Sequence, residues 1–370
     1  MNILIPDAEE IGLCFGVLHC LHEIDNVNVY ALSSEDNTLK YTRYLKKLVL
    51  YKKQNIEEFN FVSIIENAVE NFKIDLVIPV SDSGNLLLIR NKHVFSFKNK
   101  IILLPNIETY EVSTNKYLLY KHLVNNNIPC PLTIIYNKSL DLEGLTFPII
   151  IKPLKESHGG SGIKKFESIT EFNNYIESSK INNDFIIQNY INGYDIDSSV
   201  LCENGEILAY TIQKGNMNGE TDFSAQIGVD FLYEKQIHET VKHLMKSLNW
   251  NGIAHIDLRY DSKDNNFKVI EINARYWQSL EGSLVAGINF PKLHILTNQG
   301  IKFPIPKYKQ IKYLSDEGFY KKIKNDKSYL FKFKFLWHNT NLKYDLKDPI
   351  MIIYSCYLFF LNVFRKVKKS

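Results

Sequence analysis

The stretch HIDLRYDSKDNNFKVIEINAR, residues 255–275, predicts a β-hairpin in which two alternating apolar runs flank a polar turn. A turn within DSKDNN pairs Leu258 with Ile270. The same register sets Asp257 directly opposite Glu271. Like charges opposite each other destabilise a sheet, so the hairpin needs a physical reason for this pair.

A divalent cation between the two carboxylates is one such reason. Asn273 lies on the same face as Glu271 and adds a neutral oxygen, and Mg²⁺ favours hard oxygen ligands of this kind. His255 and Arg259 share the face of Asp257, where they either touch substrate or have a surface role. The alternative to a metal site is a solvated face whose register slips by one residue.

Composition and charge describe an ordinary globular protein. The chain has 370 residues, 45% apolar and 23% charged, which predicts two or three structural units. A net charge of +3 gives no support for a nucleic-acid partner. The five cysteines form no CxxC pair, and the N-terminal ten residues turn acidic, unlike a secretory signal. Both features favour a cytoplasmic protein.

The C-terminal region is unusually apolar. Residues 349–364 are almost wholly apolar and aromatic, and a basic cluster follows them. Sixteen residues are short for a membrane span, which needs about 20. The segment is therefore predicted to be a helix packed on the protein or, alternatively, a peripheral membrane contact through 349–369.

Strand and helix signals alternate over residues 1–108, which predicts a parallel sheet with helices on its faces. The loop 81–84, Ser-Asp-Ser-Gly, follows a strand; it either meets a ligand or caps the next helix. The predicted strands are Asn2–Ile5, Val27–Leu32, Leu76–Val80 and Lys100–Leu104, and Phe61–Asn71 is a predicted helix. Later helices are predicted over 114–126, 234–248, 278–286 and 291–298, with strands prevailing over 131–220.

The stretch PIIIKPLKESHGGSGIKKF, residues 148–166, combines a strand, a lysine and a glycine-rich loop. Lys152 ends a run of three isoleucines, so its partly desolvated charge requires an anionic partner. Glycine backbone N–H groups can converge on phosphate oxygens, although a flexible surface turn fits the glycines equally well. The loop residues are Gly159, Gly160, Ser161 and Gly162.

In FIIQNYINGYDIDSSVL, residues 185–201, a strand is followed by a glycine break. Gln188 and Tyr190 share one strand face, and Asp195 and Asp197 share another. Exposed backbone groups at such a break could bind a purine, and Asp195 could bind sugar hydroxyls. A plain edge strand with solvated aspartates is the alternative.

Taken in order, Lys116, IIIKP with its glycine loop, QNYINGYDID, HIDLR and VIEINAR resemble the ATP-grasp superfamily over about residues 112–300. EINARYWQSL is most similar to the carbamoyl-phosphate-synthase-like, carboxylate–amine ligase branch. The implied fold is an α/β and α+β ATP-grasp fold with an N-terminal Rossmann-like parallel-sheet domain. The implied parts are residues 1–108, a small lobe 109–188, a large lobe 189–300 and a C-terminal extension 301–370.

The resemblance implies ATP and Mg²⁺ as cofactors, with Mn²⁺ as an alternative ion. Lys116 and Lys152 would bind phosphates under the glycine loop, and Arg275 with Lys152 would stabilise the transferred phosphoryl group. Asp195 would bind the ribose. The metal ligands would be Asp257, Glu271 and Asn273. The residues implied around adenine are Gln188, which stands in place of the usual acid, Asn189, Tyr190 and Ile191.

The implied activity is an ATP-dependent ligase that turns a carboxylate into an acyl phosphate and couples it to an amine, or less readily a thiol. His255 departs from the arginine that peptide ligases often carry there, and Lys214 could line the substrate side. A homodimer is left open. The alternatives are a nucleotide-binding regulatory or scaffold module without turnover and an ATP-dependent phosphotransferase.

Overall fold

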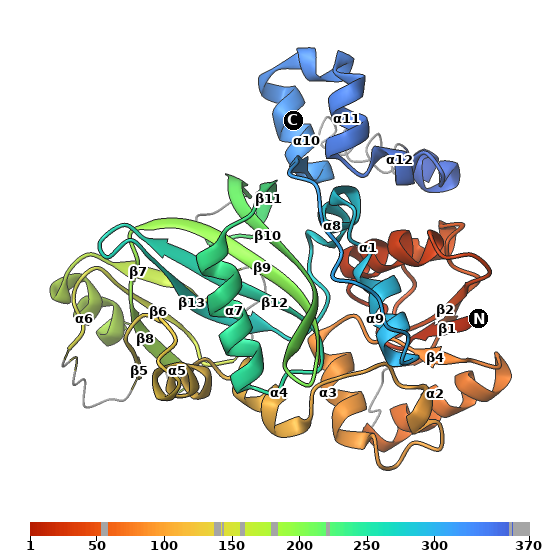
Figure 1. Cartoon of the computed structure of the whole chain (residues 1–370), viewed down its shortest axis with the longest axis horizontal. Helices are drawn as coiled ribbons and strands as arrows, with labels where there is room; N and C mark the ends of the chain where they lie inside the picture. Colours follow the sequence, from red (N-terminus) through yellow and green to blue (C-terminus); the bar gives the residue numbers. More distant parts are fainter. Residues whose placement is uncertain are drawn as a thin grey trace. The chain divides into compact units, whose positions relative to one another are not determined.

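The computed structural model describes residues 1–52, 58–136, 142, 144–155, 160–178, 184–219, 223–354 and 357, and Figure 1 labels its helices and strands. The chain forms two compact units. The first unit comprises Met1–Leu104, Arg275–Lys302 and Phe319–Ser370, and the second Pro105–Ala274 and Phe303–Gly318.

The first unit is built on a parallel sheet with the strand order β3-β2-β1-β4. Its strands are β1 (Asn2–Ile5), β2 (Asn28–Ser33), β3 (Lys47–Leu50) and β4 (Leu76–Val77). The predicted parallel sheet is confirmed, although the sequence analysis missed β3. The prediction of a strand over Lys100–Leu104 is wrong: Lys98–Lys100 forms a 3₁₀ turn, and only Ile101 bridges to Val77.

Helices cover both faces of this sheet. Leu4 joins the apolar cluster that includes Val62 and Ile65 of α2, while Ile3 and Ile5 point to the opposite face and are also fully buried. The helices predicted near 61–71, 278–286 and 291–298 are all present. The helices of this part are α1 (Ile11–His22), α2 (Glu58–Asn71), α3 (Asp82–Asn91), α8 (Leu280–Ala286) and α9 (Phe290–Asn298).

The C-terminal segment is attached to this first unit by buried polar contacts. Asp348, only 2% exposed, accepts hydrogen bonds from the Thr42 hydroxyl and from the backbone N–H of Arg43. The hydroxyl of Tyr44 donates to the carbonyl of Tyr344. The segment contains α10 (Asp316–Asn325), a 3₁₀ helix (Lys327–Phe331), α11 (Phe333–Asn339) and α12 (Leu342–Asp345). Of the helices described, none has the length and apolar character needed to cross a bilayer.

The second unit contains two antiparallel sheets. The smaller sheet has the order β5-β8-β6-β7 and packs its apolar face against Phe172 of α6 (Ile169–Ser178). The helix predicted over 114–126 is present as α5 (Lys116–Asn125), whose N-terminus is capped by the Asn115 side chain, and α4 (Ile107–Thr114) precedes it. The strands are β5 (Thr133–Ile135), β6 (Ile149–Pro153), β7 (Lys164–Phe166) and β8 (Phe185–Asn189).

The larger sheet has the order β13-β12-β9-β10-β11-β14. Helix α7 (Lys235–Ser247) is the amphipathic helix predicted over 234–248, and it contacts β9 and β10. It buries Ile237, Val241, Leu244 and Met245, which recur at helical spacing. The strands are β9 (Gly193–Glu203), β10 (Glu206–Asn218), β11 (Gln226–Phe231), β12 (Gly252–Asp261), β13 (Asn266–Asn273) and β14 (Lys312–Leu314).

Candidate active site

The hairpin of β12 and β13 sets two carboxylates opposite each other. Asp257 pairs with Glu271, as the sequence predicts. The predicted pairing of Leu258 with Ile270 is wrong, because Leu258 faces Val269 and Ile270 is the extra residue of a bulge. The bulge lets Leu258 and Val269 stay buried together while the carboxylate pair is kept.

A third carboxylate extends this pair across the sheet. On the other side of β12, Asp197 of β9 is the cross-strand partner of Asp257, so Asp197, Asp257 and Glu271 form a row over three strands. Asn273 donates from Nδ2 to Oδ2 of Asp257 at 3.2 Å. Burial raises the pKa of Asp197 well above its usual range, and the charges of Asp195 and Glu271 act in the same direction.

Asp197 is a residue of this site that was not predicted from the sequence. Alternation along the strand puts Asp195 and Asp197 on one face, but only the strand order brings Asp197 beside Asp257. That order joins β9 to a strand about 60 residues later in the chain, a pairing that local alternation does not encode.

Two buried lysines face the carboxylates. Lys116 begins α5, and its Nζ lies 3.3 Å from Oε2 of Glu271. Lys152 lies in β6 and is 2% exposed. Burial, aided by the charge of Lys116, lowers the pKa of Lys152 to about 8, although Glu271 and Asp257 partly oppose this. Burial would raise the pKa of Glu271, but Lys116 and Lys152 outweigh it and hold that pKa at about 2.

These charges make the site suitable for a phosphate–metal complex. The structure brings together four residues that the sequence analysis assigned separately to phosphates and metal: Lys116, Lys152, Asp257 and Glu271. The lysines can bind anionic oxygens, and the carboxylates with Asn273 can bind a hard cation.

The segment predicted to meet adenine lies in and just after β8. Gln188 is buried, and its Nε2 donates to the Thr133 hydroxyl at 2.7 Å. The backbone N–H of Asn189 donates to the carbonyl of Leu132, and that of Tyr190 donates to the carbonyl of Pro148. Both N–H groups therefore already donate to backbone carbonyls next to the smaller sheet.

Arg259 lies among the residues predicted to bind the nucleoside. Its Nε donates to the carbonyl of Ile191 at 2.7 Å, and its Nη2 donates to the hydroxyl of Tyr190 at 3.0 Å. Its Nη1 forms an ion pair with Asp195, the predicted ribose ligand. The role of Arg259 was left open from the sequence. In the structure its side chain contacts three of the residues predicted to bind the nucleoside.

The glycine loop connects β6 to β7. Gly160 and Gly162 have φ of 77° and 78°, in the left-handed region that favours glycine. A Cβ on Gly160 would lie 2.3 Å from the backbone oxygen of Phe223, so this position tolerates no side chain without a shift. Ser161 between them is exposed, whereas Gly159 lies outside the described residues.

Arg275 and the loop 81–84 meet within the first unit. Ser81 caps α3 by accepting a hydrogen bond from the N–H of Gly84 at 3.0 Å, which confirms the helix-cap alternative. The next residue, Asp82, places Oδ2 2.6 Å from Nε of Arg275. In the second unit, Lys214 lies 3.6 Å from the ring centre of Tyr194.

Comparisons with known proteins match part of the chain to a known domain. Residues 113–279 match the model of the ATP-grasp domain. The D-aspartate ligase of Enterococcus faecium (strain Aus0004) is 24% identical over 242 residues, 59% of this chain and 57% of that protein. The chain therefore spans little more than half the length of this curated relative.

Two solved structures share the fold. The L-amino acid ligase from Bacillus licheniformis superposes with a TM-score of 0.62 at 19% identity, covering 80% of this chain and 73% of that one. The biotin carboxylase domain of Hydrogenobacter thermophilus 2-oxoglutarate carboxylase, in complex with MgADP, gives a TM-score of 0.61 at 16% identity, covering 84% and 72%. These likenesses confirm the predicted fold class. Residues 113–279 therefore match the ATP-grasp domain, the family that the motifs of this sequence resemble.

Proposed function

We propose that the protein is an ATP-dependent ligase that activates a carboxylate as an acyl phosphate and couples it to an amine. The observation that carries this proposal is the pair of buried lysines, Lys116 and Lys152, facing the paired carboxylates of Asp257 and Glu271. Two buried ammonium groups and two half-buried carboxylates, gathered in one place, favour a ligand that itself combines anionic oxygens with a cation.

The donor set fits Mg²⁺. Asp257 and Glu271 are direct cross-strand partners, and the amide of Asn273 lies 3.2 Å from Asp257 through Nδ2, so a turn of that amide presents its oxygen. Two carboxylates and an amide oxygen are hard ligands, which Mg²⁺ and Mn²⁺ both accept. When bound, the ion would neutralise charge on the phosphate oxygens.

The chain's own residues would position the nucleotide and the transferred group. Lys116 and Lys152 would donate to phosphate oxygens; with a pKa of about 8, Lys152 still carries its proton at neutral pH. Gly160, Ser161 and Gly162 would turn backbone N–H groups toward the phosphates. Arg275 would stabilise the phosphoryl group, and its contact with Asp82 supports a fixed guanidinium orientation.

Asp195 would bind the ribose hydroxyls, and the segment Gln188–Ile191 would bind adenine. The ion pair of Asp195 with Arg259 and the contact of Arg259 with the carbonyl of Ile191 support a preformed polar wall at this place. Residues 109–188 and 189–300 would then act as the two lobes that hold the nucleotide.

The reaction balances without a protein nucleophile. A carboxylate oxygen of the substrate attacks the γ-phosphorus of ATP, the bond to the β-phosphate oxygen breaks, and ADP leaves. The amine nitrogen then attacks the acyl carbon, phosphate leaves and the nitrogen loses a proton. Amino acids are the proposed substrates, because similar proteins are a D-aspartate ligase and an L-amino acid ligase.

The test is turnover by the full chain. Protein, Mg²⁺ and ATP are incubated with pools of amino acids, and ADP, phosphate and new masses are followed. A ligase gives equal ADP and phosphate with a new amide mass, a phosphotransferase gives a phosphoester without free phosphate, and a binding module gives neither. Asp257→Asn should abolish turnover, while Asp264→Asn, an exposed change in the same hairpin, should not.

Two further predictions concern partners. A homodimer stays a prediction. Of the stretch 349–369, residues 349–354 are helical with Ile350 and Ile353 exposed, while 355–356 and 358–369 lie outside the described residues. Peripheral membrane contact there likewise stays a prediction.

A further inference from the structure

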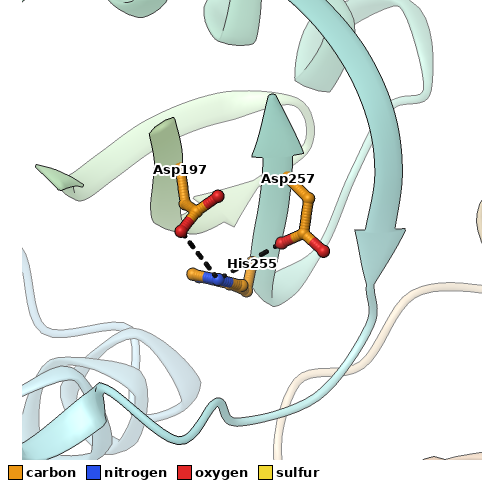
Figure 2. Close-up of side chains that lie close together, drawn as sticks. All are labelled: Asp197, His255 and Asp257. Carbon is orange, nitrogen blue, oxygen red and sulfur yellow. Dashed lines mark ion pairs between the residues drawn. The ribbon is translucent and has the colours of Figure 1, made fainter. Parts of the chain in front are cut away.

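A histidine joins two aspartates beside the proposed magnesium ligands. Figure 2 shows His255 between Asp197 of β9 and Asp257 of β12. Its Nε2 lies 3.3 Å from Oδ1 of Asp257 and 3.9 Å from Oδ2 of Asp197. One ligand atom from each side chain lies within 4.8 Å of the other two.

These separations fit one bound ion. A tetrahedral ion with bonds of about 2.1 Å holds its ligand atoms about 3.4 Å apart, close to the two measured distances. The side chains of His255 and Asp197 are 12% and 13% exposed, and Asp257 is 32% exposed, which leaves a route for an ion.

A hydrogen bond with Ser199 orients the imidazole ring of His255. The Ser199 hydroxyl lies 2.9 Å from Nδ1 of His255, on the ring nitrogen opposite the one that faces the carboxylates. A metal-bound histidine usually holds its second nitrogen in such a hydrogen bond, which sets the tautomer and the ring orientation. Nδ1 therefore points to Ser199 and Nε2 to the two carboxylates, so in the tautomer that carries its proton on Nδ1, Nε2 can bind an ion held between those oxygens.

The two oxygens of Asp257 face different partners. Oδ2 accepts from Asn273, on the side of the proposed magnesium site, whereas Oδ1 faces His255. The carboxylate can therefore bridge two ions, as a single carboxylate does in sites with two metals.

We propose that Asp197, His255 and Asp257 form a second cation site that takes a transition-metal ion such as Zn²⁺, Mn²⁺ or Co²⁺. The imidazole nitrogen sets this site apart from the all-oxygen set of Asp257, Glu271 and Asn273, because imidazole favours transition ions over Mg²⁺. The site exists without nucleotide, and the proposal holds whether or not the chain proves to be a ligase.

The experiment titrates the full chain with Co²⁺ in the absence of nucleotide and follows the visible absorption of the bound ion. The expected result is one saturable equivalent that excess Mg²⁺ does not displace. Asp197→Asn and His255→Ala should each weaken binding by more than tenfold, and Ser199→Ala by about tenfold. The matched control is His93→Asn, an exposed histidine, which should bind Co²⁺ as the wild type does.

Two outcomes would overturn the proposal. One is Co²⁺ binding that is absent or unchanged in Asp197→Asn and His255→Ala, while circular dichroism shows both variants folded. The other is a ¹⁵N spectrum in which His255 carries protons on both ring nitrogens at neutral pH and added Zn²⁺ shifts neither, because the ring then offers no lone pair to an ion. Glu271→Gln separates the two sites: it should lose Mg²⁺-dependent nucleotide binding but keep Co²⁺ binding.

Discussion

Replacing Lys152 by methionine should make the protein more stable in one pH range and poorer at binding nucleotide. Methionine has nearly the same length as lysine and no charge, and it fits between the apolar neighbours of β6. Lys152 is 2% exposed, so its ammonium group carries a desolvation penalty that methionine lacks.

The magnitude follows from the pKa. Burial lowers the pKa of Lys152 from 10.5 to about 8, and about 1.4 kcal/mol per pKa unit converts this to about 3 kcal/mol. Below pH 8 folded and unfolded chains both hold the proton, so the penalty is constant. Between pH 8 and 10.5 the unfolded chain binds more protons, so the free energy of unfolding of the wild type rises with pH.

Glu271 limits how much the free energy of unfolding of Lys152→Met rises at neutral pH, but it does not affect the dependence on pH. The variant removes one of the two cations that hold the pKa of Glu271 at about 2, so it gains less than 3 kcal/mol at pH 7. Glu271 is ionised throughout the range from pH 8 to 10.5. Its contribution is therefore constant there, and the slope reports on Lys152.

The assay is urea unfolding of wild type and Lys152→Met at half-unit steps from pH 7 to 10.5, with exposed Lys235→Met as control. The difference between wild type and Lys152→Met should shift by about 3 kcal/mol over this range. Calorimetry at pH 7 should show ATP binding at least about tenfold weaker, since a charge-assisted hydrogen bond is lost. Parallel pH curves for wild type and Lys152→Met would refute the reasoning.

Three other substitutions test other contacts. Glu271→Gln should lower the free energy of unfolding by about 1–2 kcal/mol, measured in urea at pH 7. In the wild type, the stability that this carboxylate contributes is present above pH 4.5 and should fall as the pH is lowered toward 2. An acid-unfolding profile that is the same in the variant and the wild type would contradict this. Gly160→Ala should weaken ATP binding by about tenfold in calorimetry, because its Cβ would press on the backbone of Phe223; unaltered affinity would place the loop away from the phosphates. Asp348→Ala should cost about 1–3 kcal/mol by leaving the buried Thr42 hydroxyl without its acceptor, and an unchanged thermal midpoint would show that this contact is not kept.

Most helices and strands of the fold could be predicted from the sequence because each has its own local pattern of apolar residues. The amphipathic period of residues 234–248 predicts one helix, and the alternation around Asp257 predicts one hairpin. Neither prediction needs knowledge of contacts with distant residues. The prediction of a strand over Lys100–Leu104 was wrong because a local pattern does not show whether a run of residues pairs with a sheet. These residues are apolar, but Ile101 finds only one bridge to the sheet, so an apolar run became an extended connection.

The candidate site could be predicted only in part. Asp257, Glu271 and Lys116 follow from motif order, and the structure brings them together. Contacts that join distant strands could not be predicted: Asp197 reaches Asp257 because β9 pairs with β12, and Arg259 meets Asp195 through the same pairing. Local periodicity fixes which face a side chain takes, but not which strand lies beside it.

The buried contacts of Asp348 have a consequence for synthesis on the ribosome. Thr42 and Tyr44 are made some 300 residues before Asp348 and the Tyr344 carbonyl, which complete their hydrogen bonds. Until that late segment emerges, the nascent N-terminal unit exposes polar groups and aromatic surface that the finished protein covers. Maturation of this unit therefore waits for synthesis of residues 344–348, and a chaperone that shields the unfinished surface would act during that interval.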